Sequence, residues 1–93
     1  MTKYNLLISK AALKQLELLT KDIQDRIRTA LQEVKDNPFE PRPKADIKKL
    51  RKLTKHQLYR LRVGNYRIVY VVEGRDIKVA KIFPRGEGYE WLD

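Results

Sequence analysis

The segment Tyr59–Tyr70, YRLRVGNYRIVY, constrains the fold most strongly because it predicts a β-hairpin of defined register. Gly64-Asn65 is typical of a two-residue hairpin turn, with glycine at its first position. Apolar and polar residues alternate on both sides of this turn, so one face of the hairpin is predicted to be buried. The predicted buried face consists of Tyr59, Leu61, Val63, Tyr66, Ile68, Tyr70 and Val72.

Three arginines fall on the opposite face of this hairpin. The register places Arg62 across from Arg67, with Arg60 two residues along the same face. Like charges directly opposite each other destabilise a strand pair. Asp46 is the only acidic residue within the basic segment 44–67, and Glu73 and Asp76 fall at the other end of the predicted sheet. We therefore expect an open cluster that binds a phosphate through charge-assisted hydrogen bonds. The alternative is that these arginines simply line the solvated face of a half-buried sheet.

Positive charge is concentrated around the hairpin. The chain has a net charge of +9, and residues 44–67 contain nine lysines and arginines against one acid. Such a concentrated basic segment is typical of a polyanion-binding surface, although it could also be a solvated surface that keeps the protein soluble. Within it, Lys44–Gln57 is expected to be irregular. The candidate RNA-binding residues are Lys48, Lys49, Arg51, Lys52 and Lys55.

The rest of the chain predicts two helices and two further strands. A strand is expected over Lys3–Ser9, followed by a helix capped by Ser9 and a second helix that starts near Thr20 and ends at Asn37-Pro38. The last strand is expected over Ile77–Phe83. In it, Ile77, Val79 and Phe83 would continue the buried face, Lys81 would break the pattern at a bulge, and Ala80 and Ile82 would lie on the arginine side.

This order, β-α-α-β-β-β, predicts an α+β fold in which a two-helix hairpin packs on one face of a small, mostly antiparallel sheet. The 93 residues, 1–93, are expected to form a single domain.

Composition narrows the function classes. The absence of cysteine excludes disulfides, iron–sulfur clusters and thiolate zinc sites, and the single histidine, His56, cannot form a multi-histidine metal site. Because the sequence has no apolar run long enough to span a membrane and no signal-peptide core, we expect a cytoplasmic protein.

The C-terminal tail adds possible RNA contacts. Arg85 could reach the arginine side of the sheet, and Tyr89 offers a ring for base stacking and a phenol that can donate a proton. Trp91 offers a second ring. The alternative is that both aromatic residues pack the tail onto the domain.

Three segments carry a resemblance to a known family. The hairpin YRLRVGNYRIVY, the KKL at Lys48–Leu50 and the late PRGEGY resemble the RelE/ParE superfamily of type II toxins, on the RelE-like side. The resemblance covers nearly the whole chain and implies a ribosome-dependent endoribonuclease. Such toxins cleave mRNA in the ribosomal A site by attack of the 2′-OH, need no metal or cofactor, and leave a 2′,3′-cyclic phosphate and a 5′-OH. It also implies an acidic, RelB-like antitoxin partner that wraps the toxin.

The resemblance further implies a set of catalytic residues, namely Arg60, Arg62, Arg67, Arg85 and Tyr89. RelE-like toxins often carry lysines where this chain has Arg60 and Arg62. Because arginine is a poor base, these two are expected to stabilise charge on a phosphorane-like transition state. The general base stays open, with His56, Glu87 and Glu90 as candidates. Two other functions also stay open: a ParE-like toxin that acts on DNA gyrase, and a non-catalytic relative that binds RNA or the ribosome.

Overall fold

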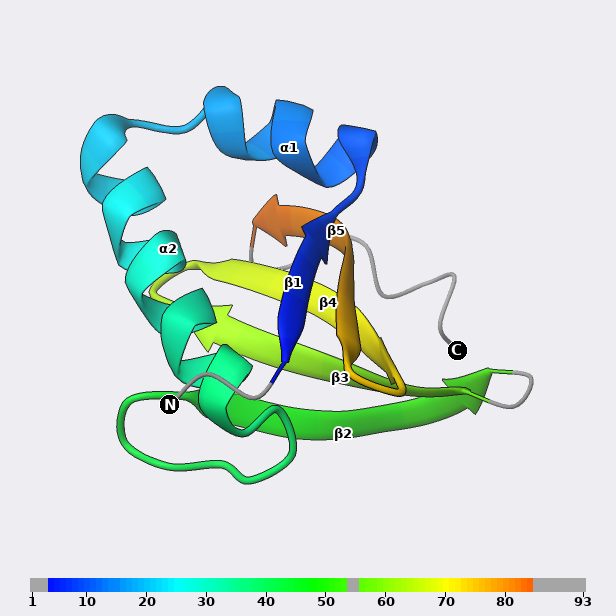
Figure 1. Cartoon of the computed structure of the whole chain (residues 1–93). Coiled ribbons are helices and arrows are strands. Elements are labelled where there is room, and N and C mark those ends of the chain that lie inside the picture. The colour runs from blue at the N-terminus through cyan, green and yellow to red at the C-terminus, as the bar shows by residue number, and fades with distance from the viewer. Residues whose placement is uncertain (1–3, 54–55, 85–93) are drawn as a thin grey trace.

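The computed structural model describes residues 4–53 and 56–84, with the backbone alone for residues 51–53. Within these residues two helices pack on one five-stranded sheet, so the expected α+β fold is confirmed (Figure 1). The sheet order is β1-β5-β4-β3-β2, with β1 parallel to β5 and the other pairs antiparallel. The elements are β1 (Asn5–Ile8), α1 (Lys10–Glu17), α2 (Lys21–Asp36), β2 (Asp46–Leu53), β3 (His56–Val63), β4 (Tyr66–Glu73) and β5 (Asp76–Pro84).

Both helices begin at the predicted caps. The Ser9 hydroxyl accepts a hydrogen bond from the Ala12 amide at 3.0 Å, and the Thr20 hydroxyl accepts one from the Ile23 amide at 3.5 Å. The buried stripes of the helices face the sheet and consist of Ala12, Leu16, Ile27, Leu31 and Val34. Neither described helix is long and apolar enough to cross a membrane.

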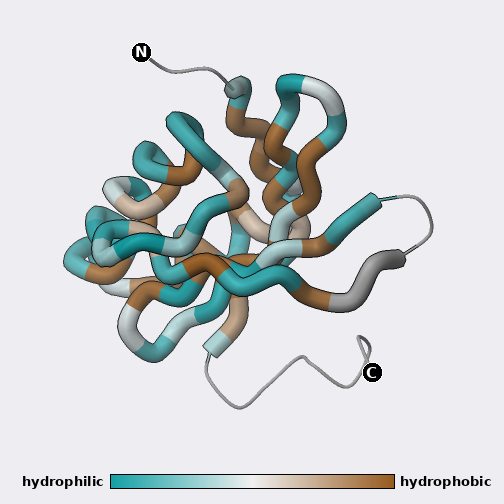
Figure 2. The backbone as a smooth tube through the Cα atoms, turned by 90° about the horizontal axis from the view of Figure 1, so that it is seen from below, coloured by the Kyte–Doolittle hydropathy of each residue, from teal (hydrophilic) through white to brown (hydrophobic). Residues whose placement is uncertain are grey.

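Side chains on the two sides of the sheet form two separate apolar clusters, because successive strand residues point to opposite faces. Figure 2 shows hydrophobic and hydrophilic positions succeeding one another along the backbone. The larger cluster lies between the sheet and the helices and contains Leu61, Ile68 and Tyr70. The smaller cluster, on the other side, consists of Leu58, Val69 and Phe83 with Leu50 and Val71 packed against it. The predicted alternation of the hairpin is therefore confirmed.

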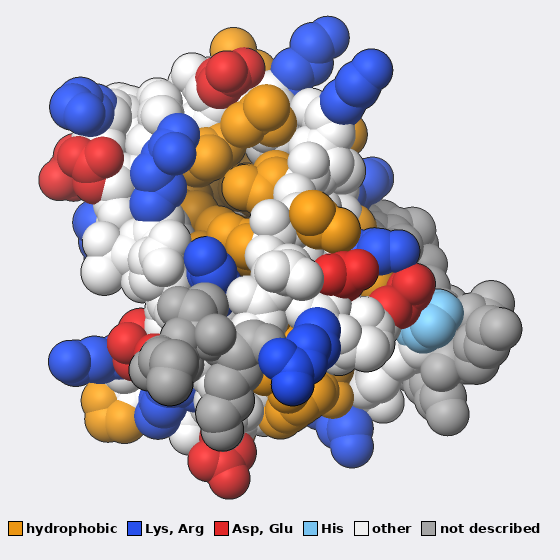
Figure 3. All heavy atoms as spheres, in the orientation of Figure 1, with side chains coloured by type: hydrophobic (Ala, Val, Ile, Leu, Met, Phe, Trp, Pro, Cys, Tyr) orange, Lys and Arg blue, Asp and Glu red, His pale blue; other side chains and the backbone are white. Residues whose placement is uncertain are grey.

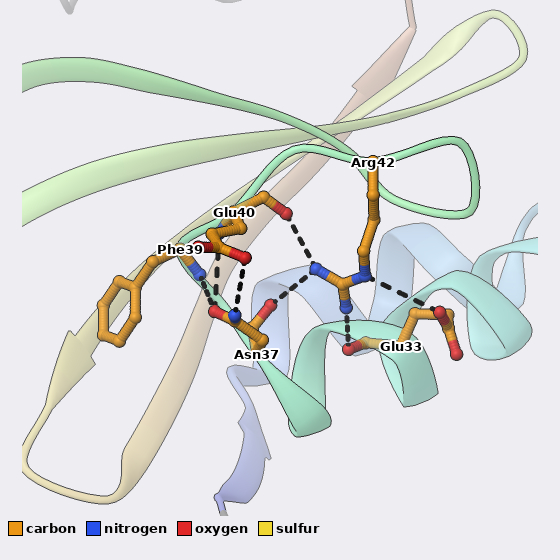
Figure 4. A network of polar contacts seen from close by, with 5 residues as sticks. All are labelled: Glu33, Asn37, Phe39, Glu40 and Arg42. Carbon is orange, nitrogen blue, oxygen red and sulfur yellow. Dashed lines mark hydrogen bonds and ion pairs between the residues drawn. The ribbon is translucent and has the colours of Figure 1, made fainter.

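The connector between α2 and β2 is fixed by Arg42 (Figure 4). Its Nη1 donates hydrogen bonds to the carbonyl oxygens of Asn37 at 3.0 Å and Glu40 at 2.7 Å, and its Nη2 donates to the carbonyl oxygen of Glu33. The Tyr70 hydroxyl donates to the Pro38 carbonyl oxygen at 2.7 Å from within the core. These bonds set where β2 begins, and so where its first residue, Asp46, lies.

The prediction of irregular structure over Lys44–Gln57 was wrong, because β2 occupies most of that segment. Ile47 pairs with Leu61 and is buried in the main cluster, whereas Lys48 and Lys49 are exposed. β2 is an edge strand, and an edge tolerates lysines since backbone pairing with one neighbour is enough to hold it.

A bulge in β5 reverses part of the predicted facing. The β4–β5 register shifts between Val69 and Tyr70, whose partners are Lys81 and Val79, so Ala80 is the extra residue. The bulge was expected here, but its consequence beyond Lys81 was not. Ile82 is buried in the helix-side cluster and Phe83 in the opposite one, which is the reverse of the prediction for these two residues.

Candidate nucleic-acid interface

The side of the sheet that faces away from the helices carries, at one end, two rows of mostly charged residues. We call this surface the arginine face. In the first row Asp46, Arg62, Arg67 and Phe83 lie side by side on β2, β3, β4 and β5. In the second row Lys48, Arg60, Val69 and Lys81 follow the same strand order. Directly paired residues share a face of the sheet, so these side chains converge on one surface.

The predicted juxtaposition of the three arginines is confirmed by the strand register. Arg62 lies directly across from Arg67, and Arg60 lies two residues along β3 on the same face. Their burial differs: 11% of the Arg60 side chain is exposed, against 45% for Arg62. Arg67 is half-buried, with its Nε and Nη1 atoms enclosed by protein. The cluster is therefore built into the sheet rather than spread over its surface.

Asp46 pairs with two of these arginines, so the expectation of an open cluster without internal pairing was wrong. Its Oδ1 accepts a hydrogen bond from Arg60 Nη2 at 3.2 Å, and its Oδ2 accepts one from Arg62 Nε at 3.0 Å. This pairing was missed because β2 was not predicted as a strand. Once β2 forms, the register sets Asp46 directly opposite Arg62.

An apolar floor adjoins the charged rows. Leu58, Val69 and Phe83 are buried on this side. Val71 continues the floor and lines a shallow hollow of about 320 Å³ together with Leu7 and Lys78. The face thus combines a basic end with an apolar surface, a combination that suits a nucleotide with its phosphate and its base.

The predicted RNA-binding lysines do not all reach this face. Lys48 is exposed and lies across from Arg60, whereas Lys49 pairs with Tyr59 and belongs to the opposite side of the sheet. Arg51 and Lys52 lie in β2, where only the backbone is described. Lys55, Arg85, Glu87, Tyr89, Glu90 and Trp91 lie outside the described residues.

Lys81 is an exposed basic residue of this face that the site prediction missed. It pairs with Val69, which places it in the same row as Arg60. The interruption of the apolar pattern in β5 was the signal that could have identified it.

His56 lies at the far end of the same side of the sheet. Its Nε2 is 3.3 Å from Glu73 Oε2, and the pale blue histidine lies beside red carboxylates in Figure 3. Glu73 Oε1 accepts a hydrogen bond from Lys78 Nζ at 2.9 Å, and this contact raises the pKa of Lys78. His56 precedes Arg60 by four residues of one strand, which corresponds to about 13 Å. The structure does not bring His56 together with the arginines.

The sequence and the fold both match one family. A family model described as the ParE toxin of the type II toxin–antitoxin system, parDE, matches residues 6–89. The chain belongs to the RelE/ParE superfamily of type II toxins. Within this superfamily, the RelE1 protein of Methanocaldococcus jannaschii is 34% identical over 90 residues, which cover 95% of this chain and 97% of that protein. Toxin RelE3 of the same organism is 33% identical over 86 residues, covering 92% and 96%.

Solved structures support the RelE-like side of the superfamily. The chain is similar to the archaeal RelE–RelB complex from Pyrococcus horikoshii OT3, with a TM-score of 0.79, 34% identity and coverage of 92% of this chain and 99% of that chain. It is also similar to the RelB–RelE antitoxin–toxin complex from Methanococcus jannaschii, with a TM-score of 0.69, 31% identity and coverage of 94% and 99%. The RelE-like resemblance expected from the hairpin is therefore confirmed.

Proposed function

We propose that this RelE-like toxin is an endoribonuclease that cleaves mRNA in the A site of the ribosome. The observation that carries the proposal is the arginine face, on which Arg60, Arg62 and Arg67 converge next to an apolar floor. Guanidinium groups bind phosphates through charge-assisted, often bidentate hydrogen bonds. An apolar floor beside them can hold a base while the phosphate lies on the arginines.

The proposed reaction is attack of a ribose 2′-OH on the adjacent phosphorus. The 2′-OH loses its proton, the bond to the 5′-oxygen breaks, and the leaving oxygen takes up a proton. A 2′,3′-cyclic phosphate and a 5′-OH result. The arginines stabilise the additional negative charge that develops on the phosphoryl oxygens, whereas they are too weakly acidic to serve as proton carriers. Arg85 and Tyr89, which lie outside the described residues, are proposed to complete this site.

The ribosome would supply the orientation that the arginines cannot. Correct in-line placement of a nucleophile can contribute several kcal/mol, about 7–11 in well-oriented systems. A message held in the A site would present its 2′-OH and its phosphate to the toxin in a fixed geometry. This proposal places the protein in the cytoplasm, together with ribosomes and messages.

A RelB-like antitoxin is the proposed protein partner. The support is that two solved relatives, at 34% and 31% identity, are in complexes of RelE with RelB. A chain with a net charge of +9 and a basic face over an apolar floor suits an acidic partner with apolar anchors.

Toeprinting on programmed ribosomes tests the activity and the site together. The wild type is expected to cut the message in the A site, and Arg67→Ala is expected to lower the cleavage rate by at least about tenfold, the effect of losing roughly 1.4 kcal/mol of transition-state stabilisation. Arg28→Gln, on an exposed position of α2, is the matched control and should cut like the wild type. Equal cleavage by Arg67→Ala would overturn the site, and no cleavage by the wild type would overturn the activity.

The description of the matching family model as a ParE toxin favours a second candidate, a toxin that acts on DNA gyrase. A supercoiling assay separates the two candidates. Inhibition of gyrase by the wild type, without cleavage of messages, would support this second function.

A further inference from the structure

We infer that Asp46 is an internal competitor of the phosphate on the arginine face, which the substrate must displace from Arg60 and Arg62. This inference rests on the proposed function, since it assigns a regulatory role within the same site. It is carried by the contacts, position and exposure of one carboxylate.

The Asp46 carboxylate is bound as a bridging phosphate would be. Its two oxygens accept from two different guanidinium groups, Oδ1 from Arg60 at 3.2 Å and Oδ2 from Arg62 at 3.0 Å. The two non-bridging oxygens of a phosphodiester have the same charge and nearly the same spacing, so they can replace the carboxylate oxygens one for one. Substrate and Asp46 therefore cannot use these two donors at the same time.

Arg60 is held more firmly than the carboxylate. Only 11% of the Arg60 side chain is exposed, and its Nε is buried without a hydrogen-bond partner among the described residues. Asp46, by contrast, is the first residue of an edge strand, and 47% of its side chain is exposed. Its side chain can turn out to solvent without breaking the pairing of β2 with β3. We therefore expect the Asp46 carboxylate, rather than Arg60, to move when a phosphate binds.

The strength of this pairing suits a competitor. The Asp46 carboxylate is about half exposed, so water and salt screen both of its ion pairs, and screened ion pairs contribute little to stability. Asp46 therefore weakens phosphate binding by a moderate factor, which we estimate at about threefold to tenfold for two such contacts. A phosphate that another surface holds in place still binds despite this loss of affinity. A phosphate on freely diffusing RNA binds more weakly by the whole factor. Asp46 consequently favours RNA that the ribosome presents over RNA in solution.

Binding of a short single-stranded RNA with 2′-O-methyl riboses, which cannot be attacked, tests the competition without cleavage. Asp46→Asn is expected to bind this RNA about threefold to tenfold more tightly than the wild type, and Asp46→Ser, the second neutral variant, should do the same. Asp46→Glu keeps the negative charge and should bind the RNA with the wild-type affinity. Thermal melts verify that each variant is folded.

Asp25→Asn is the matched control, since it changes the net charge by the same amount but on α2. Asp25 is 61% exposed, and its Oδ1 lies 4.0 Å from Lys21 Nζ. It should leave the affinity unchanged within about twofold. Equal affinity of the wild type and both neutral Asp46 variants would overturn the inference. So would an equal gain by Asp25→Asn, because the effect would then be one of net charge.

Inorganic pyrophosphate serves as a second probe and separates this inference from the proposed function. Tighter pyrophosphate binding by Asp46→Asn, together with no cleavage by any variant on ribosomes, would retain the competition and overturn the ribonuclease. Cleavage by the wild type, together with unchanged pyrophosphate and RNA binding by the Asp46 variants, would retain the ribonuclease and overturn the competition.

Discussion

Arg62 on β3 lies directly opposite Arg67 on β4, while Asp46 on β2 accepts a hydrogen bond from the other side of Arg62. The Arg62 guanidinium thus lies between Asp46, which attracts it, and Arg67, which repels it. The repulsion is a small cost to the hairpin, a fraction of a kcal/mol. An anion bound between the two arginines would remove that cost.

We therefore expect inorganic phosphate to stabilise the folded protein more than chloride at the same ionic strength. A ligand that binds only the folded state at ten times its Kd contributes about 1.4 kcal/mol, which corresponds to about 6–11 °C in Tm for a domain of this size. Thermal denaturation followed by circular dichroism measures the difference. Arg62→Gln should lose the phosphate increment and Arg28→Gln, on α2, should keep it. An increment that survives in Arg62→Gln would place the anion elsewhere.

Removing the buried hydroxyl of Tyr70 should destabilise the fold. The Tyr70 side chain is fully buried, and its hydroxyl donates to the Pro38 carbonyl oxygen at 2.7 Å. Tyr70→Phe leaves that carbonyl without its donor, at an expected cost of about 1–2 kcal/mol in the free energy of unfolding measured by urea denaturation. Tyr66→Phe, at a half-buried tyrosine, should cost less than about 0.5 kcal/mol. Similar costs for both variants would mean that the Pro38 contact contributes nothing specific.

Alkaline pH should destabilise the protein through the same residue. Burial is the main reason that the pKa of Tyr70 is raised, with a further contribution from Tyr59 and an opposing one from Arg42. An unfolded tyrosine loses its proton near pH 10, whereas folded Tyr70 keeps its proton to higher pH. The free energy of unfolding is therefore unaffected below about pH 10 and falls as pH rises above it toward the folded pKa.

Urea denaturation at a series of pH values from 8 to about 11 measures this dependence. The free energy of unfolding of Tyr70→Phe should fall less steeply with pH than that of the wild type. Part of the fall should remain, because burial also raises the pKa of Tyr59. Parallel curves for the two proteins would contradict the assignment to Tyr70.

Replacing His56 should leave cleavage intact. His56 pairs with Glu73 at 3.3 Å, about 13 Å along β3 from Arg60, so it is too far away to take a proton from a ribose bound at the arginines. His56→Gln should cut messages within about twofold of the wild-type rate in the toeprinting assay. Its melting temperature should also change little, because the pair is exposed. A loss of more than about tenfold would instead identify His56 as the general base.

The sequence was most informative where local pattern and turn chemistry act together. Alternation around Gly64-Asn65 predicted the pairing of Arg62 with Arg67, because a two-residue turn leaves a single register. Gly64 has a φ of +57°, which the first position of such a turn requires. The helix starts were equally local, since Ser9 and Thr20 cap amides three residues further along.

What the sequence did not reveal depends on partners far along the chain. The segment of β2 is dominated by lysines, and its strand character comes from pairing with β3 and from the burial of Ile47 against the core. The contact of Asp46 with Arg62 spans sixteen residues and exists only once β2 forms. In β5, the alternation itself does not show where a bulge inserts its extra residue, so the sides of Ile82 and Phe83 were exchanged.

The parallel pairing of β1 with β5 links folding to the progress of synthesis. Asn5 and Asp76 are partners in the sheet although they lie 71 positions apart in the sequence. The first strand to be made therefore has no neighbour in the sheet until β5 has been made, and closing so long a loop slows folding. During translation the β3–β4 hairpin can form before β5 is made, whereas the sheet that supports it is completed only with β5. A nascent toxin would thus lack a completed sheet until its β5 has been synthesised.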